Sequence, residues 1–190
     1  MDDLAPWRSP LAKNLHVHRA DPSARYLQLA TVTPAGLPAN RTIVFRSFVP
    51  DSNTLQFITD GRSQKVAQIH CQPYGEICWY FPKTREQFRI LGRLELVDHH
   101  HPAQPPRHQM WQTISDNARR QFTWAEPRSL RHHSAPFPET EPSALVPPDN
   151  FCLLWLHPHH IDRLSLKGTP QNRWLYELQS GVWNTIEVYP

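Results

Sequence analysis

Hydroxyl and basic side chains gather at residues 59–65, in the segment Thr-Asp-Gly-Arg-Ser-Gln-Lys. The residues before this segment are typical of a strand, and those after it have helical spacing, so a strand end leads here into a helix start. A helix start offers unpaired N–H groups and the positive end of the helix dipole, to which Thr59, Arg62, Ser63 and Lys65 add hydroxyls and charge. The pattern predicts an anion site built without a glycine-rich loop. The alternative is an ordinary capped helix with a solvated lysine.

Two more polar segments lie at the ends of neighbouring predicted strands, at residues 40–46 and 86–88. Arg41 and Arg46 are five residues apart, so a regular strand directs them to opposite faces unless a bulge intervenes. We therefore expect the two arginines to meet different groups.

Histidine is abundant, with 12 residues and clusters at 99–101, 132–133 and 157–160. A divalent metal site is one interpretation. Adjacent histidines on a strand point to opposite faces, however, and no carboxylates stand at matching spacing. Surface or loop histidines are therefore favoured, and we predict no metal site. No protein nucleophile or other catalytic residue is assigned.

The scarcity of glycine excludes several nucleotide-binding classes. The chain has 6 glycines and 20 prolines in 190 residues, and no two glycines lie within a few residues of each other. This excludes the Walker loop, the dinucleotide fingerprint and the kinase glycine-rich loop. The net charge of +3 suits a small anionic ligand but is too weak to indicate nucleic acid.

The cellular compartment follows from the cysteines and from the lack of long apolar runs. Three cysteines without a C-x-x-C pair indicate a reducing compartment. The acidic first residues do not resemble a secretory signal, and the longest strongly apolar run, 151–156, is too short to span a bilayer. We expect a soluble, cytoplasmic protein that binds neither membrane nor nucleic acid.

Short β-like runs and turn signals alternate along most of the chain, which predicts an antiparallel sheet or small barrel. The predicted strands are 26–32, 41–49, 54–59, 75–81, 86–97, 151–156, 160–166, 173–178 and 182–188. Helices are predicted at 7–20, 63–71 and 107–124, and a proline-rich loop at 127–148. We expect one domain over 1–190, with its core at about 24–98 and 150–190 and an insertion at about 102–148.

Three motifs follow one another along the chain: R-x-V-hydrophobic-x-basic at 41–46, T-x-x-x-S-x-K at 59–65 and a strand opening with Gln87. This ordered set resembles the pyridoxamine 5′-phosphate oxidase family. The resemblance covers about 26–97, with a second match near 165–190. The segments PWRSPL and ARRQFTW resemble an uncharacterised branch common in cyanobacteria and plants. The resemblance to the family implies a mainly β, antiparallel FMN-binding split barrel with a few flanking helices. It also implies a homodimer with FMN at the subunit interface.

The resemblance implies these FMN-contacting positions: Arg41, Thr42, Ile43, Val44, Ile58, Thr59, Arg62, Ser63, Gln64, Lys65, Gln87, Gln121 and Arg173. Lys65 would neutralise the phosphate, and Arg41 would bind the phosphate or the ribityl chain. Arg173 would reach FMN from the partner subunit. Gln64 stands where the family has an arginine, so one charge is missing there and Arg62 is a candidate substitute.

The resemblance places Ile43 and Val44 along the isoalloxazine ring, and Gln87 would hydrogen-bond to the ring. Gln121 matches a glutamine that contacts the flavin in the family. Arg46 matches the basic position that meets the substrate phosphate. These roles imply a flavoprotein in which FMN carries out the redox chemistry.

Departures from the family pattern concern the vitamin substrate. Thr169 and Gln171 stand where the family has an arginine and a histidine, and Leu166 stands in place of a tryptophan. We therefore expect an FMN-dependent oxidoreductase whose pyridoxamine-phosphate site is not retained. The alternatives are a non-enzymatic flavin- or haem-binding module on the same barrel and a barrel that binds no cofactor.

Overall fold

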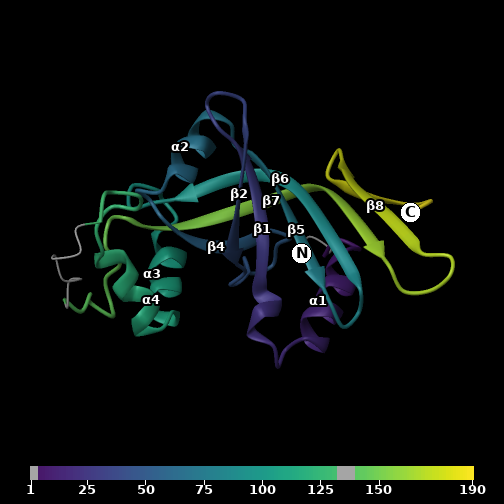
Figure 1. Cartoon of the computed structure of the whole chain (residues 1–190), viewed down its shortest axis with the longest axis horizontal. Helices are drawn as coiled ribbons and strands as arrows, with labels where there is room; N and C mark the ends of the chain where they lie inside the picture. The colour runs from purple at the N-terminus through teal and green to yellow at the C-terminus, as the bar shows by residue number, and fades with distance from the viewer. Residues whose placement is uncertain (1–3, 132–139) are drawn as a thin grey trace. The chain divides into compact units, whose positions relative to one another are not determined.

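The computed structural model of the chain describes residues 4–131 and 140–190. Figure 1 shows a fold dominated by strands. The elements are α1 (Arg8–Val17), η1 (Pro22–Arg25), β1 (Tyr26–Val32), β2 (Pro38–Val44), β3 (Ser47–Phe48), β4 (Leu55–Asp60), α2 (Gln64–Cys71), β5 (Tyr74–Phe81), β6 (Glu86–Val97), α3 (Gln104–Thr113), α4 (Asp116–Arg120), η2 (Gln121–Thr123), β7 (Phe151–Ser165), β8 (Asn172–Gln179) and β9 (Val182–Val188). The predicted mainly β fold class is confirmed.

The described residues group into two compact units, each assembled from several stretches of chain. The first comprises the residues up to 57 together with 68–95 and 155–190. The second comprises 58–67 and 96–154. The chain passes from one unit to the other inside β4, α2, β6 and β7.

The first unit contains most of an antiparallel sheet in the order β2-β1-β5-β6-β7-β4-β3, with β8 beside β7 and β9 beside β8. The β1–β2 hairpin runs in continuous register from Tyr26 opposite Val44 to Val32 opposite Pro38. Gly36, at a φ of +78°, lies in the turn of this hairpin, where glycine adopts the left-handed conformation without strain.

The core of the first unit is aromatic. The Trp79 ring lies between those of Phe45 and Phe81. Its centroid is 5.0 Å from the Phe45 centroid and 5.1 Å from the Phe81 centroid. The Trp79 indole N–H is satisfied because it donates to the Ala24 carbonyl at 2.8 Å. Trp79 and Phe81 occupy alternate positions of β5, as expected for a sheet with one buried face, and Phe45 directly follows β2.

The second unit has its own smaller aromatic core, in which Trp111, Phe122 and Phe151 meet pairwise edge to face. Arg107 is 3% exposed, and its Nε donates to the Phe151 carbonyl at 2.8 Å. This bond ties α3 to the start of β7 within the unit.

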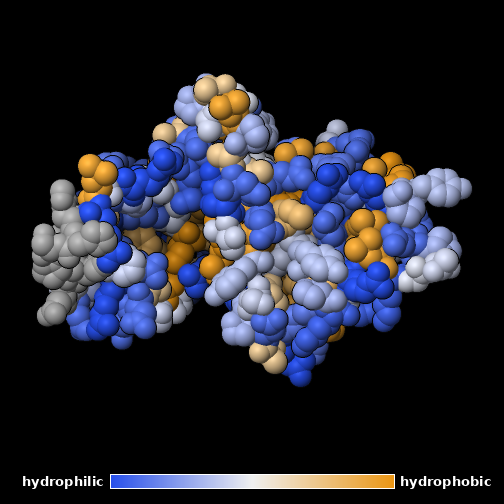
Figure 2. Space-filling view, viewed as in Figure 1, coloured by the Kyte–Doolittle hydropathy of each residue, from blue (hydrophilic) through white to orange (hydrophobic). Residues whose placement is uncertain are grey.

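The face seen in Figure 2 is mainly hydrophilic, with separate hydrophobic patches. The exposed large apolar side chains of the described residues include Leu37 at 63% and Tyr189 at 98%. None of the helices in residues 4–131 and 140–190 has the length and apolar character needed to cross a membrane.

Two predicted elements are broken in the structure. The strand predicted at 41–49 ends at Val44 and resumes only as β3, because the Arg46 N–H pairs with the Gln56 carbonyl after the β2 register has ended. The helix predicted at 107–124 stops at Thr113, since Ile114 is extended and the Ser115 hydroxyl caps a new helix by accepting from the Ala118 N–H at 3.3 Å.

One predicted interruption is absent. The strands predicted at 151–156 and 160–166 form the single strand β7, which continues through Pro158. Gly92 makes this possible, because a Cβ at that position would lie 2.4 Å from the His157 carbonyl oxygen and 3.1 Å from the Pro158 Cα. The missing side chain lets the backbone of β6 approach β7 closely.

Candidate functional site

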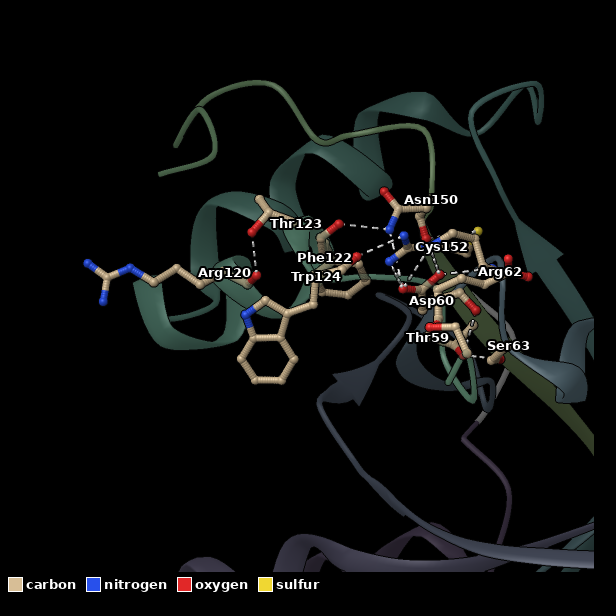
Figure 3. Close-up of polar contacts among 12 residues, drawn as sticks. Thr59, Asp60, Arg62, Ser63, Arg120, Phe122, Thr123, Trp124, Asn150 and Cys152 are labelled. Carbon is tan, nitrogen blue, oxygen red and sulfur yellow. Dashed lines mark hydrogen bonds and ion pairs between the residues drawn. The ribbon is translucent and has the colours of Figure 1, made fainter. Parts of the chain in front are cut away.

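The turn between β4 and α2 brings one ammonium group and two hydroxyl groups together in the second unit. Lys65 Nζ donates to Ser63 Oγ at 2.9 Å and to Thr59 Oγ1 at 3.0 Å. The two hydroxyl oxygens are 3.4 Å apart, and Thr59 is buried. Figure 3 shows Thr59 and Ser63 side by side at this turn. A cation and hydroxyl groups at a helix start form a donor set suited to an anion such as a phosphate.

Arg62, in the same turn, is engaged by Asp60. Its Nε donates to Asp60 Oδ1 at 3.0 Å, its Nη2 to Oδ2 at 2.6 Å, and its Nη1 to the Trp124 carbonyl at 3.0 Å. Burial alone would raise the pKa of the Asp60 carboxyl, but hydrogen bonds from Arg62 outweigh burial and hold that pKa below its usual value. The charge of Arg62 is therefore compensated by Asp60.

Asn150 links this turn to η2 and was not anticipated from the sequence. Its carbonyl accepts from the Gly61 N–H at 2.7 Å, and its Nδ2 donates to the Phe122 carbonyl at 3.0 Å and to Asp60 Oδ2 at 3.3 Å (Figure 3). A Cβ on Gly61 would lie 3.1 Å from Cys152 Sγ. The turn is thus packed against the start of β7, and the only sequence signal for Asn150 is its place in a turn-forming segment.

The remaining candidates of the second unit lie at its surface or half-buried. Gln64 is the first residue of α2 and is exposed, and its Oε1 accepts from Arg128 Nη1. Ile58 is half-buried in β4, and Gln121 is exposed at the start of η2. No sequence pattern had singled out Arg128.

In the first unit, Arg41 lies on β2 among neutral acceptors. Its guanidinium donates to Thr31 Oγ1 at 2.6 Å, to Gln68 Oε1 at 2.8 Å and to the Leu29 carbonyl at 3.2 Å. Burial lowers the pKa of Arg41, but a guanidinium group stays protonated in proteins, so Arg41 is charged. Gln68, which is 6% exposed on α2, was missed because a glutamine in a helix carries no distinguishing signal.

The neighbours of Arg41 follow the strand. Thr42 is exposed, Ile43 is 8% exposed and Val44 is half-buried. Arg46 lies beyond the end of β2, so Arg41 and Arg46 do not share one regular strand and the argument from strand alternation does not apply to them. Its Nε is buried without a hydrogen-bond partner among the described residues, and burial together with the charge of Arg25 lowers its pKa.

Arg173, on β8, is held by a buried carboxylate of its own chain. Its Nη2 donates to Asp162 Oδ2 at 2.6 Å and its Nε to Oδ1 at 2.9 Å, while Arg89 Nη2 donates to Oδ2 at 2.7 Å. The Asp162 side chain is 4% exposed. Burial would raise the pKa of Asp162, but hydrogen bonds from Arg173 and Arg89 outweigh it and lower that pKa. Gln87 is half-buried on β6, opposite Tyr80 of β5.

The histidines do not assemble into a metal centre within residues 4–131 and 140–190, where no group of three potential ligands occurs. His157 instead contacts Glu95 Oε2 at 2.7 Å and Thr54 Oγ1 at 3.1 Å. The pair at 132–133 lies outside the described residues, as does part of the predicted loop at 127–148.

Residues 4–98 match the family described as "Pyridoxamine 5'-phosphate oxidase, FMN-binding domain". The pyridoxine/pyridoxamine 5'-phosphate oxidase 2 of Arabidopsis thaliana is 36% identical over 197 residues, which cover 98% of each chain. The crystal structure of a pyridoxamine 5'-phosphate oxidase-related, FMN binding protein from Nostoc punctiforme is 49% identical, with a TM-score of 0.94 over 99% of this chain and 100% of its own. PhzG from Burkholderia lata shares the fold at 18% identity, with a TM-score of 0.78 over 100% of this chain and 95% of its own. These likenesses confirm the predicted split-barrel fold class.

Proposed function

The chain belongs to the pyridoxamine 5'-phosphate oxidase FMN-binding family, and on this premise we propose that it is an FMN-dependent oxidoreductase acting on a substrate other than pyridoxamine 5'-phosphate. FMN is its cofactor. We propose that each chain forms a single domain and works in the cytoplasm as a homodimer, with FMN at the subunit interface.

The observation that carries the proposal is the convergence of Lys65 on Thr59 and Ser63 at the start of α2. Two hydroxyls, an ammonium group and the positive end of a helix dipole match the needs of a terminal phosphate. Gly61 fits the same interpretation, because a side chain there would press on Cys152 and displace the turn. The donor set of this turn therefore suits the phosphate of FMN.

We assign the remaining cofactor contacts to residues of the first unit. The hydrogen-bond partners of Arg41 among the described residues are neutral, so its charge is available to the anionic cofactor, at the phosphate or the ribityl chain. Ile43 and Val44 would lie along the isoalloxazine, and Gln87 would hydrogen-bond to it. Arg173 would stabilise negative charge on the ring from the partner subunit. FMN supplies reversible electron and hydride transfer when bound, so the protein needs no nucleophile of its own.

The substrate is proposed from the residues that the β7–β8 turn lacks. Thr169 and Gln171 are exposed and neutral, where the family pattern has an arginine and a histidine. A doubly charged phosphate ester would meet no cation at these two positions. We therefore expect a substrate recognised by other contacts, including those of Arg46.

Cofactor binding is tested by titrating flavin-free protein with FMN and following flavin fluorescence and the absorbance band near ~450 nm. Lys65→Ala should weaken FMN binding by about 10- to 100-fold, the effect of losing a charged hydrogen bond. Lys13→Ala removes the same charge from an exposed position of α1 and should leave binding unchanged. A wild-type protein that binds no FMN would refute the function.

Activity and assembly need separate measurements. Reduction of bound flavin by pyridoxamine 5′-phosphate, pyridoxine 5′-phosphate and a panel of amines and reduced nicotinamides is followed without oxygen. Turnover of pyridoxamine 5′-phosphate would contradict the proposed loss of that substrate site. Sedimentation of the flavin-loaded protein tests the homodimer, and a monomer that retains FMN with full affinity would contradict an interfacial site.

A further inference from the structure

We propose that Arg128 supplies a second positive charge to the FMN phosphate site, doing from a distant part of the chain what an arginine at position 64 would do locally. The inference rests on the proposed function, since it adds a residue to the phosphate site assigned there. It concerns only residues of the second unit.

The direct observation is a hydrogen bond between two segments far apart in the sequence. Arg128 Nη1 donates to Gln64 Oε1, across a separation of 64 residues. Gln64 is the first residue of α2. The guanidinium of Arg128 is therefore held at the helix start where Lys65 meets Thr59 and Ser63.

Arg128 lies in a hydrogen-bonded turn of the backbone. A turn is closed by the Ser129 N–H, which donates to the Glu126 carbonyl at 3.1 Å, and the Ser129 hydroxyl donates to the same oxygen at 2.8 Å. Arg128 has a φ of +71°, in the left-handed region that a non-glycine residue enters at some cost. The turn thus fixes an unfavourable backbone conformation at the residue that contacts Gln64.

The charges at the helix start explain why an anion belongs there. Arg62 is compensated by Asp60 at 2.6 Å, so it brings no net charge to the turn. Lys65 and Arg128 bring two further positive charges to the start of α2, where the positive end of the helix dipole also lies. A phosphate dianion bound there would be attracted by all three.

The chemistry of the two side chains fits this division of work. Gln64 is neutral and can orient the guanidinium through its amide oxygen, while the other N–H groups of Arg128 can face a phosphate. A planar guanidinium pairs with phosphate oxygens more directionally than an ammonium group does. Binding of the phosphate would then join the helix start to the segment after η2.

The test compares FMN with riboflavin, which lacks the phosphate, in titrations of flavin-free protein. Arg128→Ala should weaken FMN binding by about 10- to 100-fold and leave riboflavin binding within about twofold of the wild type. The double variant Gln64→Arg with Arg128→Ala should regain most of the FMN affinity. Arg93→Ala, which removes one charge from an exposed position of β6, is the matched control.

The outcomes separate the inference from the function beneath it. If wild-type protein binds FMN but Arg128→Ala matches Arg93→Ala, the role of Arg128 is refuted while FMN binding stands. Equal weakening for FMN and riboflavin would also refute it, because a phosphate contact cannot act on riboflavin. If wild-type protein binds neither flavin, the proposed function fails, and the inference fails with it.

Discussion

Replacing Asp162 by asparagine should destabilise the protein at neutral pH, because the Asp162 carboxylate is the common acceptor of two arginines. Its side chain is 4% exposed and accepts from Arg89 Nη2 at 2.7 Å and from Arg173 Nη2 at 2.6 Å and Nε at 2.9 Å. Breaking a fully buried ion pair costs about 3–5 kcal/mol. The arginine side chains are 46% and 32% exposed, so water can resolvate them and reduce the loss. We expect about 2–3 kcal/mol.

The pH dependence follows from the direction of the Asp162 pKa. This pKa is lowered on folding, since the two arginine hydrogen bonds outweigh burial. The stabilisation is therefore fully present above the unfolded carboxyl pKa of about 3.9 and is lost as the pH falls through the folded value. The difference in unfolding free energy between wild type and Asp162→Asn should stay constant from about pH 7 to pH 5 and narrow below about pH 4.

Urea unfolding across this pH range measures both effects, and the neutral-pH loss corresponds to a fall in Tm of about 4–12 °C. Glu187→Gln makes the same chemical change at an exposed carboxylate of β9 and serves as the control. If Asp162→Asn unfolds like Glu187→Gln at pH 7, the carboxylate does not hold the two arginines. A difference that stays undiminished in acid would refute the electrostatic origin of the stabilisation.

Three further predictions follow from packing and burial. Gly92→Ala should lower stability by about 3 kcal/mol in thermal unfolding, since its Cβ would lie 2.4 Å from the His157 carbonyl oxygen; an unchanged Tm would contradict this. Burial raises the pKa of the Cys152 thiol to about 11, so iodoacetamide at pH 8 should label exposed Cys71 and spare Cys152 until urea unfolds the chain; equal labelling of both in native protein would exclude this. Asn150→Ala should lower the free energy of unfolding by about 2 kcal/mol and weaken FMN binding more than riboflavin binding, because it frees the turn before α2. Urea unfolding measures the stability and flavin titration the two affinities. Unaltered stability and affinities would rule out the linking role of Asn150.

The strands with clear alternation were predictable from the sequence. Those predicted at 26–32, 86–97 and 182–188 have the bounds of β1, β6 and β9, because alternating apolar positions and turn residues at both ends are local signals. The break after Val44 and the continuity of β7 through Pro158 were not predictable. Both depend on which backbone faces the segment across the sheet, and a glycine on β6 decides the second case.

In the candidate site too, the sequence alone determined the features that depend on local spacing. Thr59, Ser63 and Lys65 lie within seven residues, so a strand end followed by a helix start brings them together whatever surrounds them. The ordered motifs that include these residues indicated an FMN-binding family.

Only the tertiary structure decided which distant groups the candidate residues and their neighbours contact. The contacts of Arg128 with Gln64, Asn150 with Asp60 and Arg89 with Asp162 span 64, 90 and 73 residues. Such contacts depend on strand register, loop path and the burial of charge. These properties arise from the packing of distant segments, and no local spacing of residue types encodes them.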